Sequence, residues 1–328
     1  MQRAKAPFFM VGMPRSGTTM LRELLNNSPD IWISSAEGHF IAYYARRIGR
    51  YRDLTDWRNF ERLAATVRRS RAFAAWAARG VHIESREWYE ACGGYEWPAI
   101  LDALYRLVHQ QELSGEGRAW ADILWGDKTP VHLTMIPELA TMFPEARFIH
   151  IVRDVRDCCL SAQRAWGRHP LRTAQQWAER VPAARKAGEM LGPERYCEVR
   201  YEDVLRDPCR ELERLFGFLG VASPGTAGEL FRGASSGGGA AGQRRVVAEN
   251  AYKWKSAMPA SLQRSVESIA GGALSERGYE RVHPDVVPTH VTWPRMAFYR
   301  LRDFGCWWRY VRNRMGGWLK ALKFVLAH

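Results

Sequence analysis

Apolar and polar positions near the N-terminus predict a short buried strand followed directly by a helix. Residues 7–11 form a continuous apolar run, and apolar residues then recur at helical spacing over 18–27. The Asn-Asn-Ser-Pro-Asp segment at 26–30 ends the helix, because these residue types favour turns. The stretch between strand and helix is rich in small residues, so it is predicted to be a tight loop.

The same pattern predicts further strands and helices along the chain. The other predicted strands are residues 31–33, 148–152 and 197–201, of which 148–152 is the clearest. The other predicted helical regions are residues 40–120, which are mostly helical, 131–142, 155–166 and 208–219, which ends at Gly220. Residues 124–128 are predicted to lead into the helix at 131–142.

Strands that alternate with helices predict an α/β, P-loop-like three-layer fold, with a central parallel sheet and helices on both faces. In such sheets ligands bind at the carboxyl ends of the strands. The turns after residues 7–11 and 148–152 both fall at such ends. These two turns are therefore the first places to look for binding chemistry.

Composition narrows the class of partner without choosing one. The 328 residues carry a formal net charge of +13, which favours anionic partners such as nucleotide phosphates, acidic glycans, nucleic acid or anionic lipid. A general preference for arginine explains the same charge equally well. The length suits one large domain, or one domain with an appendage.

The cysteine pattern gives no sign of a metal site or of a disulfide framework. None of the six cysteines forms a CxxC pair, and no His/Cys spacing suggests zinc, so no metal is expected. The apolar run at 8–11 is too short for a signal peptide, and no stretch reaches the roughly 18 apolar residues of a membrane span. We therefore expect a reduced, cytoplasmic protein, with peripheral membrane contact left open.

The loop from Gly12 to Thr19 has the features of an anion-binding site. A helix N-terminus presents backbone N–H groups and a partial positive charge, and glycines at 12 and 17 let the backbone approach the ligand closely. The Gly-x4-Gly spacing matches the P-loop of ATPases, but Thr18 stands where that loop has lysine. The positive charge lies instead at Arg15, which can neutralise charge on a departing group.

A second pair of candidates follows the strand at 148–152. Arg153 comes directly after the strand, and Ser161 lies about two turns into the next helix. An arginine fork and a hydroxyl can hold a second phosphate. In the alternative interpretation, Arg153 pairs with a neighbouring aspartate and Ser161 is incidental.

Taken together, these motifs resemble the 3′-phosphoadenosine-5′-phosphosulfate-dependent sulfotransferases over about residues 7–281. The residues that carry the resemblance are Pro14-Arg15-Ser16-Gly17-Thr18-Thr19, Arg153 with Ser161, Arg200-Tyr201-Glu202-Asp203-Val204, Asp207-Pro208, Trp254-Lys255 and Arg277-Gly278-Tyr279. The resemblance implies that residues 15–19 hold the 5′-phosphosulfate, and that Arg153 and Ser161 hold the 3′-phosphate.

The resemblance also implies contacts with the rest of the nucleotide. The candidates are Tyr201 and the segment Lys253-Trp254-Lys255, which resembles the element that closes over the donor and supplies a basic residue and an aromatic ring. Either lysine of that segment is open as the inward-facing one. The preceding glycine-rich residues 233–248 are either a plain surface loop or a lid that the ligand orders.

Two further elements resemble the glycan-type and tyrosine-type branch more than the small phenol sulfotransferases. Glu37, just after the second predicted strand, is the candidate general base, and His39 is its rival. Lys128, in an Asp-Lys-Thr-Pro element, would stabilise developing negative charge. The alternative for Lys128 is a solvated lysine at a helix start, with Thr129 as the cap.

The resemblance implies an enzyme of the EC 2.8.2 type that uses the nucleotide sulfate donor without a metal. Its acceptor would carry a hydroxyl or amine, and a carbohydrate or other large natural product is favoured. Two other functions remain open. One is a P-loop kinase, with Asp154 after the strand at 148–152 as a magnesium ligand; the other is a membrane-associated binding protein with a degenerate nucleotide pocket.

The C-terminal segment changes character, so we divide the chain into a sulfotransferase domain at 1–283 and an extension at 284–328. Residues 291–328 hold eight basic residues against one acid, Asp303, with nine aromatics interleaved. The pattern is typical of a basic amphipathic helix on an anionic membrane. It also suits a terminal helix that packs on the domain or on a second subunit.

Overall fold

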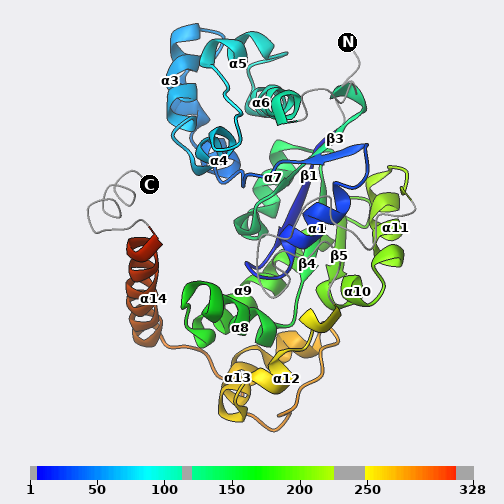
Figure 1. The fold of residues 1–328 in the computed structure, drawn as a ribbon, viewed down its shortest axis with the longest axis vertical. Helices are drawn as coiled ribbons and strands as arrows, with labels where there is room; N and C mark the ends of the chain where they lie inside the picture. The colour runs from blue at the N-terminus through cyan, green and yellow to red at the C-terminus, as the bar shows by residue number, and fades with distance from the viewer. Residues whose placement is uncertain (1–5, 113–119, 225–247, 315–328) are drawn as a thin grey trace.

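A five-stranded parallel sheet forms the centre of the molecule (Figure 1). The computed structural model describes residues 6–112, 120–224 and 248–314. The strands are β1 (Phe8–Gly12), β2 (Ile31–Ile33), β3 (Leu124–Lys128), β4 (Arg147–Val152) and β5 (Tyr196–Arg200), in the spatial order β2-β3-β1-β4-β5. The predicted α/β class is confirmed, and the four predicted strands are present within a residue or two of the expected bounds.

Residues 124–128 correct the sequence-based prediction, because they form a strand, β3, and not a lead-in to a helix. This strand lies between β2 and β1, and all five of its residues are buried. Its sequence, Leu-Trp-Gly-Asp-Lys, has little β propensity. Gly126 is required there because the ring of Phe8 on β1 lies 2.6 Å from where its Cβ would stand. Packing against β1 therefore outweighs local preference.

Helices flank the sheet and extend beyond it. They are α1 (Thr18–Leu25), α2 (Phe40–Ala45), α3 (Trp57–Val67), α4 (Arg71–Ala77), α5 (Ser85–Ala91), α6 (Trp97–Glu112), α7 (Ile136–Met142), α8 (Val155–Trp166), α9 (Pro170–Glu189), α10 (Tyr201–Arg206), α11 (Pro208–Leu219), α12 (Trp254–Ala257), α13 (Ala260–Ser275) and α14 (Trp293–Arg314). Short 3-10 turns occupy Ile48–Tyr51, Trp120–Asp122, Pro130–Thr134 and Ala248–Asn250. The predicted helices at 155–166 and 208–219 are confirmed as α8 and α11.

The helix predicted at 131–142 is wrong as a single element. The chain forms a 3-10 turn at Pro130–Thr134, breaks at Met135, and begins α7 at Ile136. Pro137 has no backbone N–H to donate to an earlier turn, so a continuous helix cannot pass through it. The long helices α9 and α13 were not among the predicted elements.

The apolar run of β1 is explained by burial on both faces of the sheet. Phe8 and Met10 pack in one core cluster with residues of α1 and α11, whereas Phe9 and Val11 belong to the cluster on the other face. Successive residues of a strand point to opposite faces, so both sets must be apolar in a three-layer fold. The turns at the strand ends are thereby held by two packed layers.

Helices α3–α6 gather beyond the β2–β3 side of the sheet, and α12 and α13 lie toward the opposite end of the molecule (Figure 1). The ring of Trp32 on β2 packs edge-on against Tyr105 of α6, with centroids 6.0 Å apart. The helical character predicted for 40–120 is confirmed for the described part of that region.

Two predicted regions are only partly described. The glycine-rich segment 233–248 lies outside the described residues except for its last residue, as does the chain after residue 314. Among the helices described, none has the length and apolar character needed to cross a bilayer.

Candidate functional site

The candidate residues meet at one edge of the sheet. Each of the five strands ends at or just before a candidate: Glu37 follows β2, Lys128 ends β3, the 13–19 loop follows β1, Arg153 follows β4 and Tyr201 follows β5. Because the strands are parallel, all these positions lie at the carboxyl edge. The strand order places Glu37 and Lys128 on one side of the central loop, and Arg153 and Tyr201 on the other.

Two glycines let the central loop lie close to its neighbours. Gly17 has φ 99°, and a Cβ there would stand 2.3 Å from the ring of Tyr201. A Cβ on Gly12 would stand 2.6 Å from the carbonyl oxygen of Ile151. Neither position can carry a larger side chain without moving the backbone or the ring, so the loop needs glycine at both.

The loop also offers hydrogen-bonding groups that the protein itself leaves unsatisfied. Ser16 is fully buried, and its Oγ makes no hydrogen bond within the described residues. Helix α1 begins at Thr18 and has no side-chain cap, which leaves first-turn N–H groups available to a ligand. Thr19 follows in the same turn and is half-buried. An anion fits this arrangement, because it would accept from all these donors at once.

Arg15 reaches across the loop to the next candidate. Its Nε donates to Ser161 Oγ on α8 at 3.0 Å, and its guanidinium lies 5.3 Å from the ring centroid of Trp166. Burial, and after it the charge of Arg153, lowers the pKa of Arg15 below its ordinary value. No carboxylate in the described part of the chain forms a salt bridge with Arg15. Two neighbouring arginines with this environment call for a bound anion.

Arg153 is held as a fixed fork beside the loop. Its guanidinium donates to the carbonyl oxygens of Arg15 at 3.2 Å and of Asn250 at 2.7 Å, and lies 4.2 Å from the ring centroid of Tyr201. Its Nε has no hydrogen-bond partner among the described residues. Asp157 lies 3.5 Å away, so the neighbouring-aspartate interpretation of Arg153 describes one of its contacts. The structure nevertheless joins Arg15, Ser161 and Arg153 into one group.

The 253–255 segment lies against α8. Trp254 is buried with its ring over the Arg156 guanidinium at 3.5 Å, and its backbone N–H donates to Asp157 at 2.9 Å. Lys253 donates to the side chain of Asn250, whereas Lys255 is exposed. Trp254 therefore anchors the segment next to Arg153.

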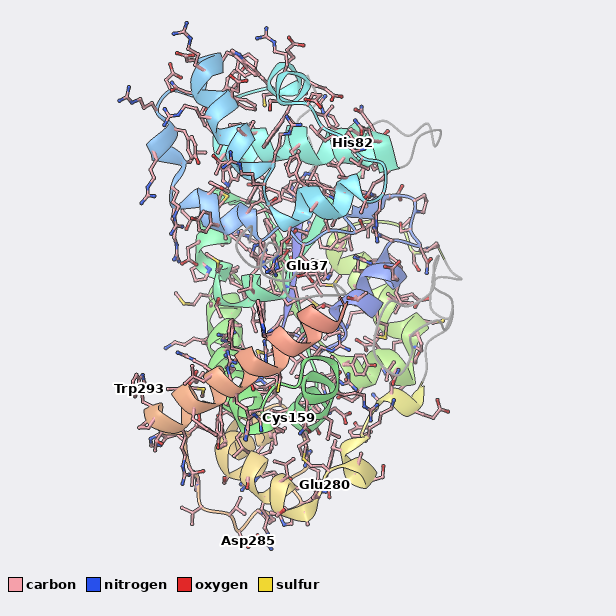
Figure 2. The ribbon with its side chains drawn as sticks, turned by 60° about the vertical axis from the view of Figure 1, so that its left-hand side comes forward. Glu37, His82, Cys159, Glu280, Asp285 and Trp293 are labelled. Atoms are coloured by element: carbon pink, nitrogen blue, oxygen red, sulfur yellow. The ribbon has the colours of Figure 1, made fainter. Side chains whose placement is uncertain are left out.

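Glu37 and Lys128 form an ion pair at the β2–β3 side of the edge. Lys128 Nζ lies 2.6 Å from Glu37 Oε1, and His39 Nε2 lies 3.0 Å from the other carboxylate oxygen. The Lys128 side chain is only 5% exposed, so the solvated-lysine interpretation does not describe it; Thr129 makes no side-chain cap. Glu37 lies near the middle of the molecule, as Figure 2 shows, and keeps 36% of its side chain exposed.

The neighbours of Glu37 keep it ionised. Burial by itself raises its pKa, but the hydrogen bond from His39 and the charge of Lys128 outweigh burial and lower the pKa to about 2. The carboxylate is therefore in its proton-accepting form across the whole physiological range.

A buried hub that the sequence did not reveal holds the Glu37 loop in place. Asp127 is fully buried, and its Oδ2 accepts from the Gly38 backbone N–H and from Tyr105 Oη, both at 3.0 Å. A Cβ on Gly38 would stand 2.5 Å from that oxygen, so glycine permits the contact. His132 Nδ1 lies 3.0 Å from the other oxygen. The hub ties the chain after Glu37 to the strand that carries Lys128.

Asp154 is a structural residue, which corrects the magnesium-ligand interpretation. It is fully buried, and Arg156 donates to both of its oxygens, at 2.9 and 2.7 Å. Arg156 also pairs with Glu267 of α13 at 2.7 Å. Arg156 therefore supplies the positive charge that faces both oxygens of Asp154. The neighbouring motifs Arg200 to Asp203 and Arg277 to Tyr279 belong to the same scaffold, because Tyr279 donates to Glu202, and Glu202 accepts from the Asp154 backbone.

Comparison with known families settles what kind of protein carries this edge. A sulfotransferase family model matches residues 7–224, which include the loop, Glu37, Lys128, Arg153, Ser161 and Tyr201. The chain belongs to the sulfotransferase family. The resemblance drawn from the sequence motifs is thereby confirmed at the level of the family.

Curated sulfotransferases are distant relatives of the chain. The omega-hydroxy-beta-dihydromenaquinone-9 sulfotransferase Stf3 of Mycobacterium tuberculosis is 26% identical over 259 residues, 66% of this chain and 63% of the relative. Carbohydrate sulfotransferase 5 of Mus musculus is 26% identical over 182 residues, 46% of each chain. The matches thus span less than two thirds of the length of these relatives.

Solved structures share the fold. The sulfotransferase domain of the Synechococcus olefin synthase has a TM-score of 0.56 at 21% identity, covering 85% of this chain and 97% of that domain. The sulfotransferase domain of the curacin biosynthetic pathway has a TM-score of 0.50 at 20% identity, covering 85% of this chain and 99% of that domain. The central sheet and its flanking helices are therefore those of a sulfotransferase fold.

Sequence reasoning missed Trp166, Tyr105 and Asp127 as parts of the site. Trp166 ends α8, five residues after Ser161, and no local pattern connects it with Arg15. Asp127 stands next to Lys128, but only the pairing of β3 with β1 and β2 shows that it is buried. These residues become visible only when the strands are placed in order.

Proposed function

We propose that this protein transfers a sulfonate group from 3′-phosphoadenosine-5′-phosphosulfate to a hydroxyl or amine of a large acceptor, with Glu37 as the general base. One observation carries the proposal. The Glu37–Lys128 ion pair, at 2.6 Å, lies at the same edge of the sheet as the Arg15 loop, one strand away. A base and two cations, Arg15 and Lys128, would thereby be available around one reacting centre.

Residues of the central loop and of the β4–β5 side would hold the donor. The unsatisfied Ser16 hydroxyl and the first-turn N–H groups at Thr18 and Thr19 suit the 5′-phosphosulfate. Arg153 and Ser161 suit the 3′-phosphate, because a guanidinium fork and a hydroxyl are both donors. Arg15 would lie between the 5′-phosphosulfate and the 3′-phosphate, because it belongs to the central loop and its Nε donates a hydrogen bond to Ser161.

The nucleotide end of the donor would lie along the β5 side. Tyr201, between Gly17 and Arg153, is proposed to line the pocket there, and the segment 253–255 to cover it. Trp254 anchors that segment, and Lys255 is the exposed cation within it. Lys253 donates to Asn250, whose carbonyl oxygen accepts from Arg153, so it would help to fix the arginine fork.

The donor supplies a sulfonate already bonded to a good leaving group. The acceptor oxygen attacks sulfur and its proton passes to Glu37, while the bond between sulfur and the 5′-phosphate oxygen breaks and adenosine 3′,5′-bisphosphate leaves. Arg15 would neutralise the negative charge on the departing phosphate, and Lys128, next to Glu37, the charge on the sulfonyl oxygens. In-line displacement of this kind requires the base and the leaving group to stand on opposite sides of sulfur. The strand order is consistent with this requirement.

Lys128 would pair first with Glu37 and then with the negative charge that develops on the donor. In the free protein it pairs with Glu37 and, with His39, keeps the pKa of the carboxylate at about 2. If Lys128 turns toward the charge that builds up on the donor, Glu37 loses a cation and becomes a stronger base at that moment. His39, which contacts the other oxygen of Glu37, is proposed to orient the carboxylate and remains the rival base.

The helices next to β2 and β3, together with the names of two relatives, support the proposed class of acceptor. Helices α3–α6 lie there, next to the strands that carry Glu37 and Lys128, so they are proposed to shape the acceptor site (Figure 1). Of the relatives, one acts on a hydroxylated menaquinone and another on carbohydrate, according to their names. A hydroxyl on a large molecule is common to both.

Radiolabelled donor and a panel of acceptors provide the test. The panel contains oligosaccharides, a hydroxylated isoprenoid lipid, a tyrosine peptide and a small phenol. We expect transfer to a large hydroxylated acceptor, and a loss of about 100-fold or more in kcat for Glu37→Gln. Glu213→Gln, an exposed glutamate on α11, is the matched control and keeps the full rate.

The Glu37→Gln variant also decides between the two candidate bases. A Glu37→Gln enzyme with a near-normal rate, together with a His39→Gln enzyme that is inactive, would transfer the base assignment to His39. Labelled donor that binds but passes its label to no acceptor in the panel would contradict the proposed acceptor class. Failure of the protein to bind adenosine 3′,5′-bisphosphate would contradict the donor assignment itself.

A further inference from the structure

Helix α14 is fixed to the domain along one side. The ring of Tyr299 stacks on His169 at 3.6 Å, and the Asp303 carboxylate accepts from the His169 backbone N–H at 2.8 Å and from Arg172 at 2.7 Å. Gln175 of α9 accepts from the Val291 backbone N–H just before the helix. The predicted packing of a terminal helix on the domain therefore describes this inward side of α14.

The opposite side of α14 is apolar and exposed. Trp293 is 79% exposed, Phe298 63%, Leu301 73% and Phe304 56%. At 100° per residue these four side chains fall within one arc of about 140°, nearly opposite the arc that holds Tyr299 and the buried Asp303. Figure 2 shows α14 lying on the outside of the molecule, with Trp293 at its outer end. We call these four residues the outer face.

Arginines outnumber carboxylates around the outer face. Arg295, Arg300 and Arg302 are exposed on the same helix, and the one acidic residue of α14, Asp303, is turned inward and paired with Arg172. The neighbouring Arg180 on α9 belongs to the same cluster. Burial lowers its pKa first, and the charges of Arg172 and Arg300 lower it further, although Glu179 opposes them. Within the described part of α14, the carboxylate of Asp303 also lies 3.9 Å from Arg302, whereas Arg295 and Arg300 form no ion pair with a described carboxylate.

We propose that the outer face of α14 docks on an anionic lipid surface. Large apolar side chains bordered by arginine, on a helix whose other side is fixed to a folded domain, are the features of a helix that lies in the interface of a bilayer. Trp and Phe suit the boundary between head groups and acyl chains, and arginine pairs with lipid phosphate. The proposal concerns this surface alone and does not depend on the reaction assigned above.

Charge argues for lipid over a second copy of the chain as the occupant. A symmetric dimer through this face would bring the arginines of two α14 helices together, and the one acidic residue of the described helix, Asp303, is already engaged by His169 and Arg172. The whole chain carries a formal net charge of +13, which attracts an anionic membrane at long range and repels another copy.

The inward side of α14 contacts the end of α8. Cys306 on α14 lies 2.8 Å from where a Cβ on Gly167 would stand. The residue before Gly167 is Trp166, the ring that faces Arg15. A lipid surface against the outer face would lie on the far side of α14 from this contact, about 10 Å away, the diameter of a helix.

Flotation of the full chain with vesicles tests the proposal. The vesicles are phosphatidylcholine alone, and phosphatidylcholine with about a third phosphatidylglycerol. We expect binding to the anionic vesicles that weakens as salt rises, and little binding to phosphatidylcholine alone. The double variant Phe298→Ser with Leu301→Ser should bind at least about tenfold more weakly, because it removes two large apolar groups. Val282→Ser with Val287→Ser, two exposed apolar positions off the helix, is the matched control and should bind normally.

A second pair of variants separates charge from apolar contact. Arg295→Gln with Arg302→Gln should weaken binding by about fivefold for each arginine and flatten the salt dependence. Arg62→Gln with Arg69→Gln, two exposed arginines on and after α3, is the control of equal charge. Unchanged melting temperatures show that the variants are folded, since all these positions are exposed.

Three outcomes would overturn the proposal. The first is wild-type protein that does not float with anionic vesicles. The second is equal binding by wild type and both double variants, which would place the lipid contact elsewhere. The third is a wild-type dimer in sedimentation equilibrium that the Phe298→Ser, Leu301→Ser variant converts to a monomer, with no vesicle binding, which would make the outer face a contact between copies.

Discussion

Gly17 offers a sharp test of the donor loop, because its replacement by alanine has a predictable geometric cost. Gly17 has φ 99°, where a residue with a Cβ is strained. The added methyl would also stand 2.3 Å from Cδ2 of Tyr201, more than 1 Å inside ordinary contact. Either the loop must leave its conformation, or the Tyr201 ring must move away from Arg153.

The magnitude follows from these two terms. The left-handed backbone costs a residue with a Cβ about 1–2 kcal/mol. Moving the ring loses the contact with Arg153, whose guanidinium lies 4.2 Å from the ring centroid, for another ~0.5–2 kcal/mol. A total of about 1.5–4 kcal/mol corresponds to roughly a 10-fold to 900-fold loss in affinity for an anion bound by this loop.

Calorimetric titration with adenosine 3′,5′-bisphosphate, paired with thermal unfolding, measures the effect. If the loop rearranges to relieve the strain that Gly17→Ala introduces, the nucleotide binds more weakly. If the loop keeps its conformation and the strain remains, the Tm falls. Gly49→Ala is the matched control, because Gly49 lies in a 3-10 turn with no atom within 4 Å of the added Cβ. It should change neither quantity.

The result that would refute the reasoning is equally clear. A Gly17→Ala protein with wild-type Kd and wild-type Tm would show that the loop does not hold the conformation on which the anion site depends. A matched loss in Gly49→Ala would show that the effect belongs to glycine replacement in general.

Three further predictions concern the base, its support and the scaffold. In Lys128→Met the pKa of Glu37 rises from about 2 toward its ordinary value, so the acid limb of the pH–rate profile, where Glu37 gains a proton, moves to higher pH. In Tyr105→Phe the buried Asp127 loses a hydrogen bond; we expect about 1–3 kcal/mol lower stability by denaturant unfolding, with kcat falling more than donor affinity. In Glu267→Ala the buried arginine of α8 loses one of its two carboxylates, and we expect about 3 kcal/mol lower stability with donor affinity unchanged.

Each of these changes has a control at an exposed position. Lys186→Met should leave the pH profile unchanged, and Tyr43→Phe and Glu213→Ala should leave stability unchanged. A Lys128→Met profile that superimposes on the wild-type profile would disprove the coupling of Lys128 to Glu37. A Glu267→Ala protein as stable as the Glu213→Ala control would mean that the buried pair contributes nothing to stability.

Local signals were enough for the central strand and its loop. The apolar run before Gly12, the small residues of the loop and the apolar spacing after Thr18 act within a few residues of one another, so they can be recognised in the sequence. The same holds for β4 and α8, whose bounds place Arg153 and Ser161 at their expected positions.

The pairing of the candidates required the tertiary structure. Nothing local connects Arg15 with Ser161, which is 146 residues away, or Lys128 with Glu37, 91 residues away. The sequence therefore assigned Arg15 and Ser161 to opposite ends of the donor, whereas the structure joins them by a hydrogen bond.

Strand β3 shows most clearly what the sequence by itself determines and what it does not. Its sequence identifies Lys128 as chemistry-bearing, but the low β propensity of its residues hides the strand and, with it, the role of Asp127. Pairing with β1 and β2 buries Asp127 and Lys128. It thereby fixes Lys128 against Glu37, and Asp127 against the loop that carries Glu37. Residue types thus set the chemistry that is available, while strand order decides which groups meet, because burial and pairing across the sheet outweigh local preference.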